Sequence, residues 1–297
     1  MKTPLLIPLP GNDWLAITLA ANLGYDKGTL ELRTFPDGET YLRFLTSPEQ
    51  RSVALVCTLN HPNDKILPVL FAAATARELK AKRVGLLSPY LAYMRQDRRF
   101  KAGEGVTSQQ IARLLSHSFD WLITVDPHLH RYGSLADIYS IPTRVVHAAP
   151  LISQWIRANV ASPIVIGPDT ESEQWVAAVA AEAGAPYSVL NKVRRGDRDV
   201  EITLKDLSMW TDRTPVLVDD IVSSGRTMIE STRLLTKAGW PPPVAIAVHG
   251  LFADASDVLL EQAGARLVTS NTVLHRTNAI DIAPLLTGPI AEFAIGP

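Results

Sequence analysis

The sequence predicts an α/β protein with two similar domains, each built on a mainly parallel sheet flanked by helices. Apolar, strand-like runs alternate with segments of helical period, which is typical of parallel strands covered on both faces. One pattern of apolar run, polar loop and helix occurs twice, and 162 residues separate its starting points at Val53 and Pro215. The chain has 297 residues, which is the usual length of about two domains.

The elements of the two halves follow the same order. In the first half, apolar runs occupy residues 53–58, 83–90 and 121–128, with a helix expected from about Lys65 to Leu79. In the second half, the corresponding runs occupy residues 215–220, 244–252 and 265–275. We place the boundary near Ile141 and Pro142, which gives domains of residues 1–142 and 143–297.

Composition excludes several classes of protein. The net charge is −1, whereas nucleic-acid-binding domains are usually strongly basic, so we expect no nucleic acid partner. No apolar run approaches the length of about 18 residues that suggests a membrane span, and prolines interrupt the N-terminal segment. The single cysteine, Cys57, cannot form an internal disulfide. We therefore expect a cytoplasmic protein without a membrane partner.

The strongest chemical signal is the segment 215–239, where an apolar run is followed by two acidic residues, a small polar turn and a helical period. Such a turn places N–H groups and hydroxyls at a helix N-terminus, where they stabilise a phosphate dianion. Two carboxylates beside it suit a cis-diol or a bridging Mg²⁺, so a sugar phosphate would satisfy both halves of the site. A simpler interpretation is a turn in which one Asp caps the helix, but this requires neither the second Asp nor the SSGRT run.

The segment VDDIVSSGRT (218–227) resembles the phosphoribosyl-diphosphate-binding loop of type I phosphoribosyltransferases and of ribose-phosphate diphosphokinases. The order and spacing of five further motifs resemble the diphosphokinases: FPDGE (35–39), RQDRR (95–99), VDPH (125–128), GPD (167–169) and NKVRR (191–195). The resemblance implies two tandem phosphoribosyltransferase-like domains, the first on the ATP side and the second on the ribose 5-phosphate side. It also implies that MgATP gives its diphosphoryl group to the 1-hydroxyl of ribose 5-phosphate, forming 5-phosphoribosyl 1-diphosphate and AMP.

On the ribose 5-phosphate side, the resemblance implies that the diol and the metal are held by Asp219 and Asp220. It implies that the 5-phosphate is held by Ser223, Ser224, Gly225, Arg226 and Thr227. This chain departs from its relatives at two positions, since they often have Asp at position 223 and Gly at position 226. The Arg226 guanidinium could either contact the phosphate or point outward, and helix geometry favours the outward direction.

The GPD segment lies between an apolar run and a helical period. From the residues alone, Asp169 could simply cap the following helix. The resemblance implies instead that Asp169 contacts Mg²⁺ and the ribose. Thr170-Glu171-Ser172 follows where relatives usually have glycines, and this departure restricts close approach of the backbone to a ligand.

On the ATP side, FPDGE is expected to form a tight turn between two alternating runs. The resemblance implies in addition that Phe35 stacks on the adenine of a neighbouring subunit's ATP while Asp37 and Glu39 accept its amino hydrogens. This arrangement requires a homo-oligomer, either a dimer or a hexamer built from dimers.

RQDRR is a basic run, which is usually a solvated surface, although guanidinium groups also suit a triphosphate. The resemblance assigns Arg95, Gln96 and Asp97 to the ATP site and leaves Arg98 and Arg99 open as interdomain salt-bridge residues. The segment 107–110, TSQQ, has a capping-box pattern and is expected to begin a helix.

The segment VDPHLHR places Asp126, His128 and His130 at alternate positions, which could form a zinc site. The resemblance implies instead that His128 is a ligand of the ATP phosphates and their Mg²⁺. It gives no such role to His130.

NKVRR and the residues after it are charged and could form a solvated hairpin. The resemblance implies a flexible catalytic loop in which Lys192 and Arg194 close over the transferring group, and transfer of this type depends mainly on positioning and charge neutralisation. Two alternatives to such a kinase remain. One is a catalytically silent homologue that regulates a true synthase by co-assembly, and the other is a phosphoribosyltransferase, which the duplicated domain and RQDRR disfavour.

Overall fold

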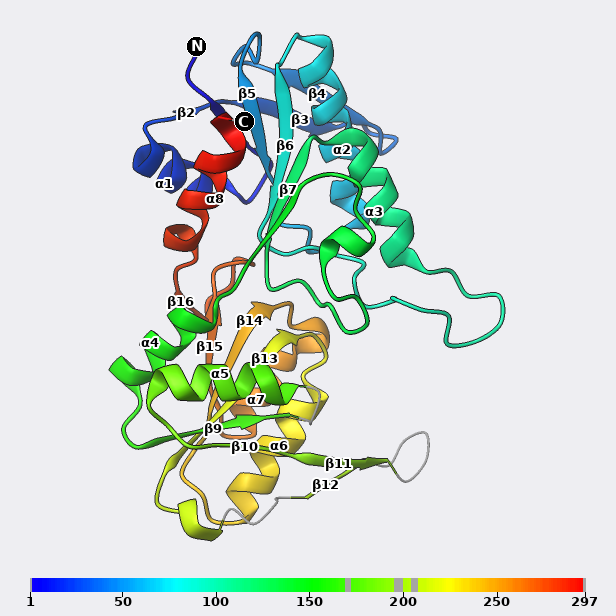
Figure 1. The fold of residues 1–297 in the computed structure, drawn as a ribbon. Helices are drawn as coiled ribbons and strands as arrows, with labels where there is room; N and C mark the ends of the chain where they lie inside the picture. The colour runs from blue at the N-terminus through cyan, green and yellow to red at the C-terminus, as the bar shows by residue number, and fades with distance from the viewer. Residues whose placement is uncertain (1, 169–171, 195–199, 204–207, 296–297) are drawn as a thin grey trace. The chain divides into compact units, whose positions relative to one another are not determined.

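The computed structural model describes residues 2–168, 172–194, 200–203 and 208–295 (Figure 1). The chain divides into two compact units: unit 1 is Met1–His147 with Ala283–Pro297, and unit 2 is Ala148–Ile282. Each unit contains a six-stranded sheet in which every neighbouring pair of strands runs parallel, which confirms the predicted α/β fold class.

The sheet of unit 1 has the strand order β2-β1-β5-β6-β7-β8. Its strands are β1 (Leu5–Pro8), β2 (Asp26–Lys27), β5 (Ser52–Val56), β6 (Arg83–Ser88), β7 (Trp121–Val125) and β8 (Thr143–Val146). Its helices are α1 (Asp13–Leu23), α2 (Asn63–Glu78), α3 (Thr107–Ser118) and α8 (Ala283–Ile295), with a 3₁₀ turn at Leu135–Asp137. Strands β3 (Leu30–Thr34) and β4 (Thr40–Phe44) form a separate antiparallel hairpin.

The sheet of unit 2 has the strand order β10-β9-β13-β14-β15-β16. Its strands are β9 (Pro163–Gly167), β10 (Tyr187–Val189), β13 (Thr214–Val222), β14 (Val244–Gly250), β15 (Arg266–Ser270) and β16 (Asn278–Ile280). Its helices are α4 (Ala149–Asn159), α5 (Glu173–Ala183), α6 (Arg226–Lys237) and α7 (Ser256–Gln262), with 3₁₀ turns at Ser208–Trp210 and Ala253–Ala255. Strands β11 (Asn191–Arg194) and β12 (Val200–Thr203) form a second antiparallel hairpin.

The strands are apolar because both faces of each sheet are covered. In unit 1, Leu55, Leu86 and Ile123 of the three central strands have no exposed surface. Gly85 of β6 is required by the neighbouring strand, since a Cβ at this position would lie 1.8 Å from a ring atom of Trp121. Among the described residues, no helix combines the length and the apolar character needed to cross a membrane.

The repeat predicted from the sequence is visible in the two sheets. Strands β5, β6 and β7 hold the third to fifth positions of one sheet, and β13, β14 and β15 hold the same positions of the other. The observed units differ from the predicted division into 1–142 and 143–297 at two places. Strand β8 pairs with β7 and so extends unit 1. Helix α8 also belongs to unit 1, because its apolar side buries Leu286 and Ile290 and stacks Phe293 on Trp121.

Candidate active site

In unit 2, the predicted sugar-phosphate segment lies at the carboxyl end of β13, at the third position of the sheet. The strand continues beyond the apolar run that ends at Val218 and reaches Val222, because β14 runs alongside it to Gly250. The acidic pair therefore lies within the strand, and both Asp219 and Asp220 are half-buried. Ligands of open α/β sheets bind at this edge, beyond the carboxyl ends of the strands.

The turn after β13 begins helix α6 without a side-chain cap. Gly225 is the N-cap residue, with φ of 64°, and no side-chain hydrogen bond caps the helix. Ser223 and Thr227 are half-buried, whereas Ser224 and Arg226 are exposed. A helix N-terminus of this kind can offer backbone N–H groups to an anion, as a phosphate site requires.

Strand β9 ends at Gly167, where the chain has no room for a side chain. A Cβ at this position would lie 2.6 Å from the hydroxyl oxygen of Ser172. The next predicted site residue, Asp169, lies outside the described residues, as do Thr170 and Glu171. The N-cap residue of α5 is Ser172, and the alternative in which Asp169 only caps this helix stays a prediction.

The NKVRR segment begins the hairpin β11–β12 (Figure 1). Lys192 lies opposite Ile202 and Arg194 opposite Val200 in the antiparallel register. The backbone of this segment thus forms the hairpin that its charged residues suggested. The side chains of both strands lie outside what the structure describes, and so do residues 195–199.

In unit 1, β6 and β7 are neighbours, so the RQDRR segment after β6 and the VDPH segment at the end of β7 leave the same edge of the sheet. Tyr132 links the two segments, because its hydroxyl donates to the Asp97 carbonyl oxygen (3.1 Å) and lies 2.9 Å from the Ser108 hydroxyl. Arg131 Nη1 lies 3.4 Å from Asp97 Oδ2. The structure thus joins two motifs through Arg131 and Tyr132, which no sequence pattern had indicated.

Of the three RQDRR residues predicted to bind ATP, only Arg95 is exposed. The Asp97 side chain is 3% exposed, and the Gln96 amide oxygen accepts a hydrogen bond from the Thr107 hydroxyl (3.2 Å). The Ser108 hydroxyl donates to the Gln96 carbonyl oxygen (3.1 Å). Because these tertiary contacts use the hydroxyls, α3 has no side-chain cap, and the predicted capping box is wrong.

The VDPH segment brings His128 and His130 together, with ring centroids 4.9 Å apart. Asp126 pairs with His147, whose Nδ1 lies 2.8 Å from Asp126 Oδ1. This hydrogen bond raises the pKa of His147 against the opposing effect of burial. Within the part of the chain that the structure describes, no three His, Cys, Asp or Glu side chains are arranged to hold a metal ion, so the zinc alternative gains no support.

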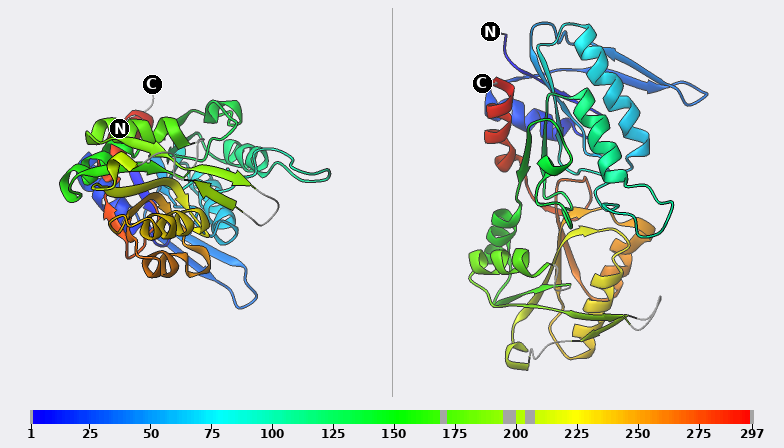
Figure 2. Two further views of the ribbon diagram at one scale, coloured as in Figure 1. Left: turned by 90° about the horizontal axis from the view of Figure 1, so that it is seen from below. Right: turned by 45° about the vertical axis from the view of Figure 1, so that its right-hand side comes forward.

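The FPDGE segment forms the turn of hairpin β3–β4, as predicted. The Phe35 N–H donates to the Glu39 carbonyl oxygen (2.7 Å), and Asp37 Oδ1 accepts from the Glu39 N–H (3.2 Å). Phe35 is 38% exposed, and both acidic side chains are exposed. Arg33 lies over the rings of Phe35 and Tyr41. The hairpin, in blue, projects from the rest of unit 1 in Figure 2, so its tip is free to meet another molecule.

Comparisons with known proteins agree with the two-unit architecture. Two family descriptions match the chain: the N-terminal domain of ribose phosphate pyrophosphokinase over residues 5–118, and the phosphoribosyl transferase domain over residues 134–281. The ribose-phosphate pyrophosphokinase of Saccharolobus solfataricus is 34% identical over 82% of this chain and 84% of that protein. The ribose-phosphate pyrophosphokinase of Methanopyrus kandleri is 34% identical over 92% of each chain. The crystal structure of phosphoribosylpyrophosphate synthetase from Mycobacterium smegmatis has the same fold, with a TM-score of 0.84 and 23% identity over 98% of both chains.

Proposed function

The chain belongs to the ribose-phosphate pyrophosphokinase family, and we propose that it transfers the diphosphoryl group of MgATP to the 1-hydroxyl of ribose 5-phosphate. The products are 5-phosphoribosyl 1-diphosphate and AMP. The observation that carries the proposal is the turn after β13, where half-buried Asp219 and Asp220 precede a helix N-terminus without a side-chain cap. A ribose phosphate carries the two groups that these features accept, a diol and a dianion.

On the ribose side, we assign the diol to Asp219 and Asp220. The 5-phosphate is held by the turn, where Gly225 lets the backbone approach closely and the dipole of α6 favours negative charge. An inward-pointing Arg226 side chain would occupy the volume of the phosphate, so we assign the phosphate contacts to backbone N–H groups and to the hydroxyls of the turn rather than to its guanidinium. These hydroxyls belong to Ser223, Ser224 and Thr227.

On the ATP side, we assign the phosphates to Arg95, which is exposed, and to His128, which is half-buried. A guanidinium can bind a phosphate through two parallel hydrogen bonds. Gln96 and Asp97 belong to the same loop, but their side chains contact Thr107 and Arg131. They therefore act by shaping the loop that presents Arg95.

Mg²⁺ is the cofactor that we propose. This ion prefers oxygen ligands, and the carboxylates of Asp219 and Asp220 fit that preference. Asp169, a predicted ligand, would add a third carboxylate. His128, the other predicted ligand, offers nitrogen, so we assign it first to the ATP phosphates. When bound, the ion neutralises charge on the phosphate oxygens.

We assign the catalytic role to Lys192 and Arg194. They lie two residues apart in β11. Two cations in one short strand suit the charge that develops on the diphosphoryl group during transfer, and neutralising this charge is the main task of an enzyme of this type.

We propose that the active enzyme is a homo-oligomer in the cytoplasm. Phe35, Asp37 and Glu39 are exposed at the tip of a projecting hairpin, so they are available to hold the adenine bound by a second copy of the chain.

The test is an assay of AMP release from ATP by the purified chain with Mg²⁺. We expect release that depends on ribose 5-phosphate and is matched by formation of 5-phosphoribosyl 1-diphosphate. A chain that binds both substrates but releases no AMP would be the silent regulatory homologue. A chain that instead consumes 5-phosphoribosyl 1-diphosphate when given a nucleobase would be a phosphoribosyltransferase, and either result would contradict the proposal.

A further inference from the structure

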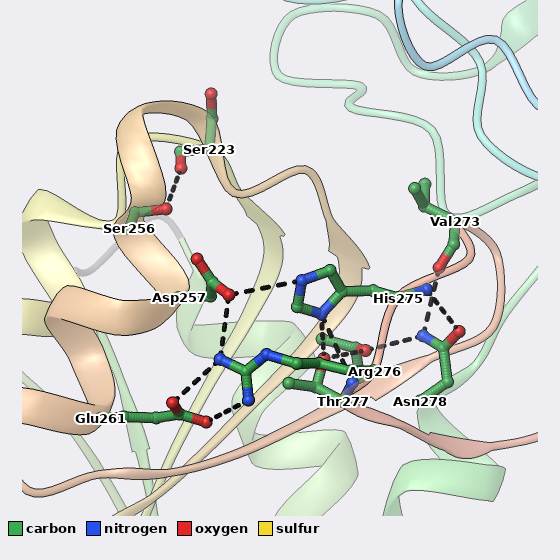
Figure 3. Close-up of polar contacts among 10 residues, drawn as sticks. Ser223, Ser256, Asp257, Glu261, Val273, His275, Arg276, Thr277 and Asn278 are labelled. Carbon is green, nitrogen blue, oxygen red and sulfur yellow. Dashed lines mark hydrogen bonds and ion pairs between the residues drawn. The ribbon is translucent and has the colours of Figure 1, made fainter.

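The turn to which we assign the 5-phosphate rests on helix α7 (Figure 3). The hydroxyl of Ser256, which has no exposed surface, donates to the Ser223 carbonyl oxygen at 2.6 Å. A Cβ at Gly225 would lie 3.1 Å from the Cβ of Ser256 and 3.4 Å from Cδ1 of Leu260. The turn is thus joined to α7 by a hydrogen bond and by close packing, and its shape depends on where this helix lies.

The connection from β14 to α7 has an unfavourable backbone conformation. Phe252, Asp254 and Ala255 have φ of 45°, 55° and 54°, a left-handed region that costs about 1–2 kcal/mol for each residue other than glycine. The N–H groups of Leu251 and Phe252 both donate to the Val222 carbonyl oxygen, at 2.9 and 3.1 Å. The strained connection therefore holds the end of β13, and it persists only where surrounding contacts fix it.

Arg276 supplies contacts that fix α7 (Figure 3). Its guanidinium binds Asp257 Oδ2 at 2.9 Å and both carboxylate oxygens of Glu261 at 2.7 and 2.9 Å. The two acidic residues lie four positions apart on α7, so one side chain spans a full turn of the helix. The hydrogen bonds from Arg276 hold the pKa of Glu261 below its usual value. His275 adds a second contact, because its ring lies 4.5 Å from the ring of Phe252 in the strained connection.

The segment that carries Arg276 is itself held by side chains. The Asn278 amide nitrogen donates to the carbonyl oxygens of Val273 (3.1 Å) and Ser270 (2.8 Å). The Asn278 amide oxygen accepts from the His275 N–H at 2.9 Å. Asn278 belongs to β16 and Ser270 to β15, so the segment that carries Arg276 is anchored to the sheet at both ends.

We propose that Arg276 and Ser256 are positioning residues that hold the turn Ser223–Gly225 in the shape that binds the 5-phosphate. The inference rests on the ribose 5-phosphate site proposed above. Arg276 fixes α7 through Asp257 and Glu261, and α7 fixes the turn through Ser256. Neither positioning residue belongs to the six motifs that relate this chain to its family, so the support of the turn is a feature of this sequence separate from those motifs.

Two variants test the inference, and each has a matched control. Arg276→Gln removes the guanidinium, and Arg144→Gln is its control because Arg144 Nη2 also contacts both carboxylate oxygens of a glutamate, Glu292 in unit 1, at 2.7 and 2.8 Å. Ser256→Ala removes only the hydroxyl. Its control is Ser153→Ala, since Ser153 is also fully buried and donates to backbone carbonyl oxygens at 2.8 and 3.0 Å.

The kinetic readout is the KM for each substrate together with kcat. We expect the KM for ribose 5-phosphate to rise about five- to tenfold in both test variants, while the KM for ATP and kcat change less than about twofold. The reason is that the lost contacts stabilise bound ribose 5-phosphate equally in the ground state and in the transition state. The controls should leave all three constants unchanged. A residue that only stabilised the fold would lower the melting temperature without changing one KM selectively.

Hydrogen exchange of the substrate-free protein gives a readout that needs no activity. We expect amides of residues 221–228 to exchange at least about fivefold faster in both test variants, because a local opening becomes easier, and at the wild-type rate in both controls. If the wild-type chain releases no AMP, the proposed function fails and the exchange rates alone decide the inference. Unchanged exchange would overturn it, and so would faster exchange in an active enzyme whose KM for ribose 5-phosphate stays the same.

Discussion

Each unit carries an antiparallel hairpin at the same point of its topology. Hairpin β3–β4 lies between β2 and β5 in unit 1, and β11–β12 lies between β10 and β13, which hold the same sheet positions in unit 2. The first hairpin presents one aromatic and two acidic side chains at its tip, whereas the second carries Lys192 and Arg194 along one strand. We assign the first to recognition of a base and the second to neutralisation of charge.

The turns after the equivalent strands β5 and β13 also differ in what fills them. After β5, Lys65 of α2 donates to the Thr58 carbonyl oxygen at 2.8 Å and to the amide oxygen of Asn60. The Thr58 N–H in turn donates to the Asn12 amide oxygen at 2.9 Å. After β13, the Ser256 hydroxyl of α7 donates to the Ser223 carbonyl oxygen at 2.6 Å, and neither α2 nor α6 has a side-chain cap. We call the first turn closed because Lys65 of its own helix binds it, and the second open because we assign it to the 5-phosphate.

A third difference lies at the ends of the last two strands of each sheet. The same backbone hydrogen bond joins these strand ends in both units, at 3.0 Å. The adjoining side chains are Asp126 and His147 in unit 1, but Asn271 and Asp281 in unit 2. Only the first pair contains a group that changes charge near neutral pH. The duplicated backbone is therefore a constant scaffold, and the polar side chains at its edge decide what each unit does.

The largest expected effect concerns hairpin β11–β12. We expect Lys192→Ala to lower kcat by about two to three orders of magnitude with little change in either KM, which is the loss typical of one preorganised transition-state donor. Steady-state AMP release with both substrates varied measures this. Lys237→Ala, at the exposed end of α6, is the control. Near-normal turnover of the Lys192→Ala chain would remove the catalytic role from this hairpin.

The second prediction concerns the closed turn after β5. Lys65→Met keeps the length of the side chain but leaves the Thr58 carbonyl and the Asn60 amide oxygen without this donor, so we expect the free energy of unfolding to fall by about 1–3 kcal/mol. Urea unfolding measures the loss. The KM values should stay unchanged at a temperature where the variant is folded. A raised KM for ribose 5-phosphate with normal stability would mean that this turn also binds a ligand.

The third prediction concerns the tip of hairpin β3–β4. Stacking of one base on an aromatic ring is worth about 1–3 kcal/mol, so Phe35→Ala should raise the KM for ATP at least about fivefold. Phe71→Ala, which removes an exposed ring from α2, should leave it unchanged.

Mixing the variant chains shows whose ATP the tip contacts. Oligomers that combine Phe35→Ala chains with Lys192→Ala chains should recover activity, because some sites then have both residues intact. If subunits are shown to exchange and the mixture is no more active than either parent, the adenine loop serves its own subunit.

The fourth prediction concerns the open turn after β13. We expect Arg226→Gly to change the KM for ribose 5-phosphate less than about threefold, which is below roughly 0.7 kcal/mol, because this exposed guanidinium is not assigned to the phosphate. The measurement is made at constant ionic strength. A rise of about tenfold would equal the loss of a charge-assisted hydrogen bond and would make Arg226 a phosphate ligand.

The smallest expected effect concerns the pair Asp126–His147. Because the folded-state pKa of His147 lies above its ordinary value of 6.5, the pair contributes stability that is fully present below pH 6.5 and is lost as the pH rises through the folded-state pKa. His147→Gln should therefore flatten the fall in melting temperature across this range. His117→Gln, at an exposed position of α3, should not. An unchanged pH profile in His147→Gln would assign the dependence to another group.

Much of the fold follows from short-range patterns, and the exceptions have physical causes. The apolar runs predicted the central strands correctly, because a strand that is buried on both faces is apolar at nearly every position. The end of β13 was harder to predict, since two aspartates are unusual in a strand and only the neighbouring β14 provides the hydrogen bonds that extend it. The place of α8 in unit 1 depends on a stack between Phe293 and Trp121, which are far apart in the sequence.

In the candidate site, too, contacts between residues far apart in the sequence could not be predicted. Motifs indicated the residues of each loop, but they did not indicate that Asp97 is buried against Arg131 or that Ser256 supports the turn at Ser223. These partners come from other elements of the sheet and carry no local signal. The predicted capping box failed for this reason, because tertiary partners competed for its hydroxyls.

The return of α8 to unit 1 has a consequence for the order in which the chain folds during synthesis. Unit 2 is continuous in the sequence and can complete its core once Ile282 has left the ribosome. Unit 1 is synthesised first but still lacks Leu286, Ile290 and Phe293 at that stage, so the face around Trp121 stays uncovered. We therefore expect the nascent first half to depend on chaperones until helix α8 emerges, and the second half to reach its native state before the first.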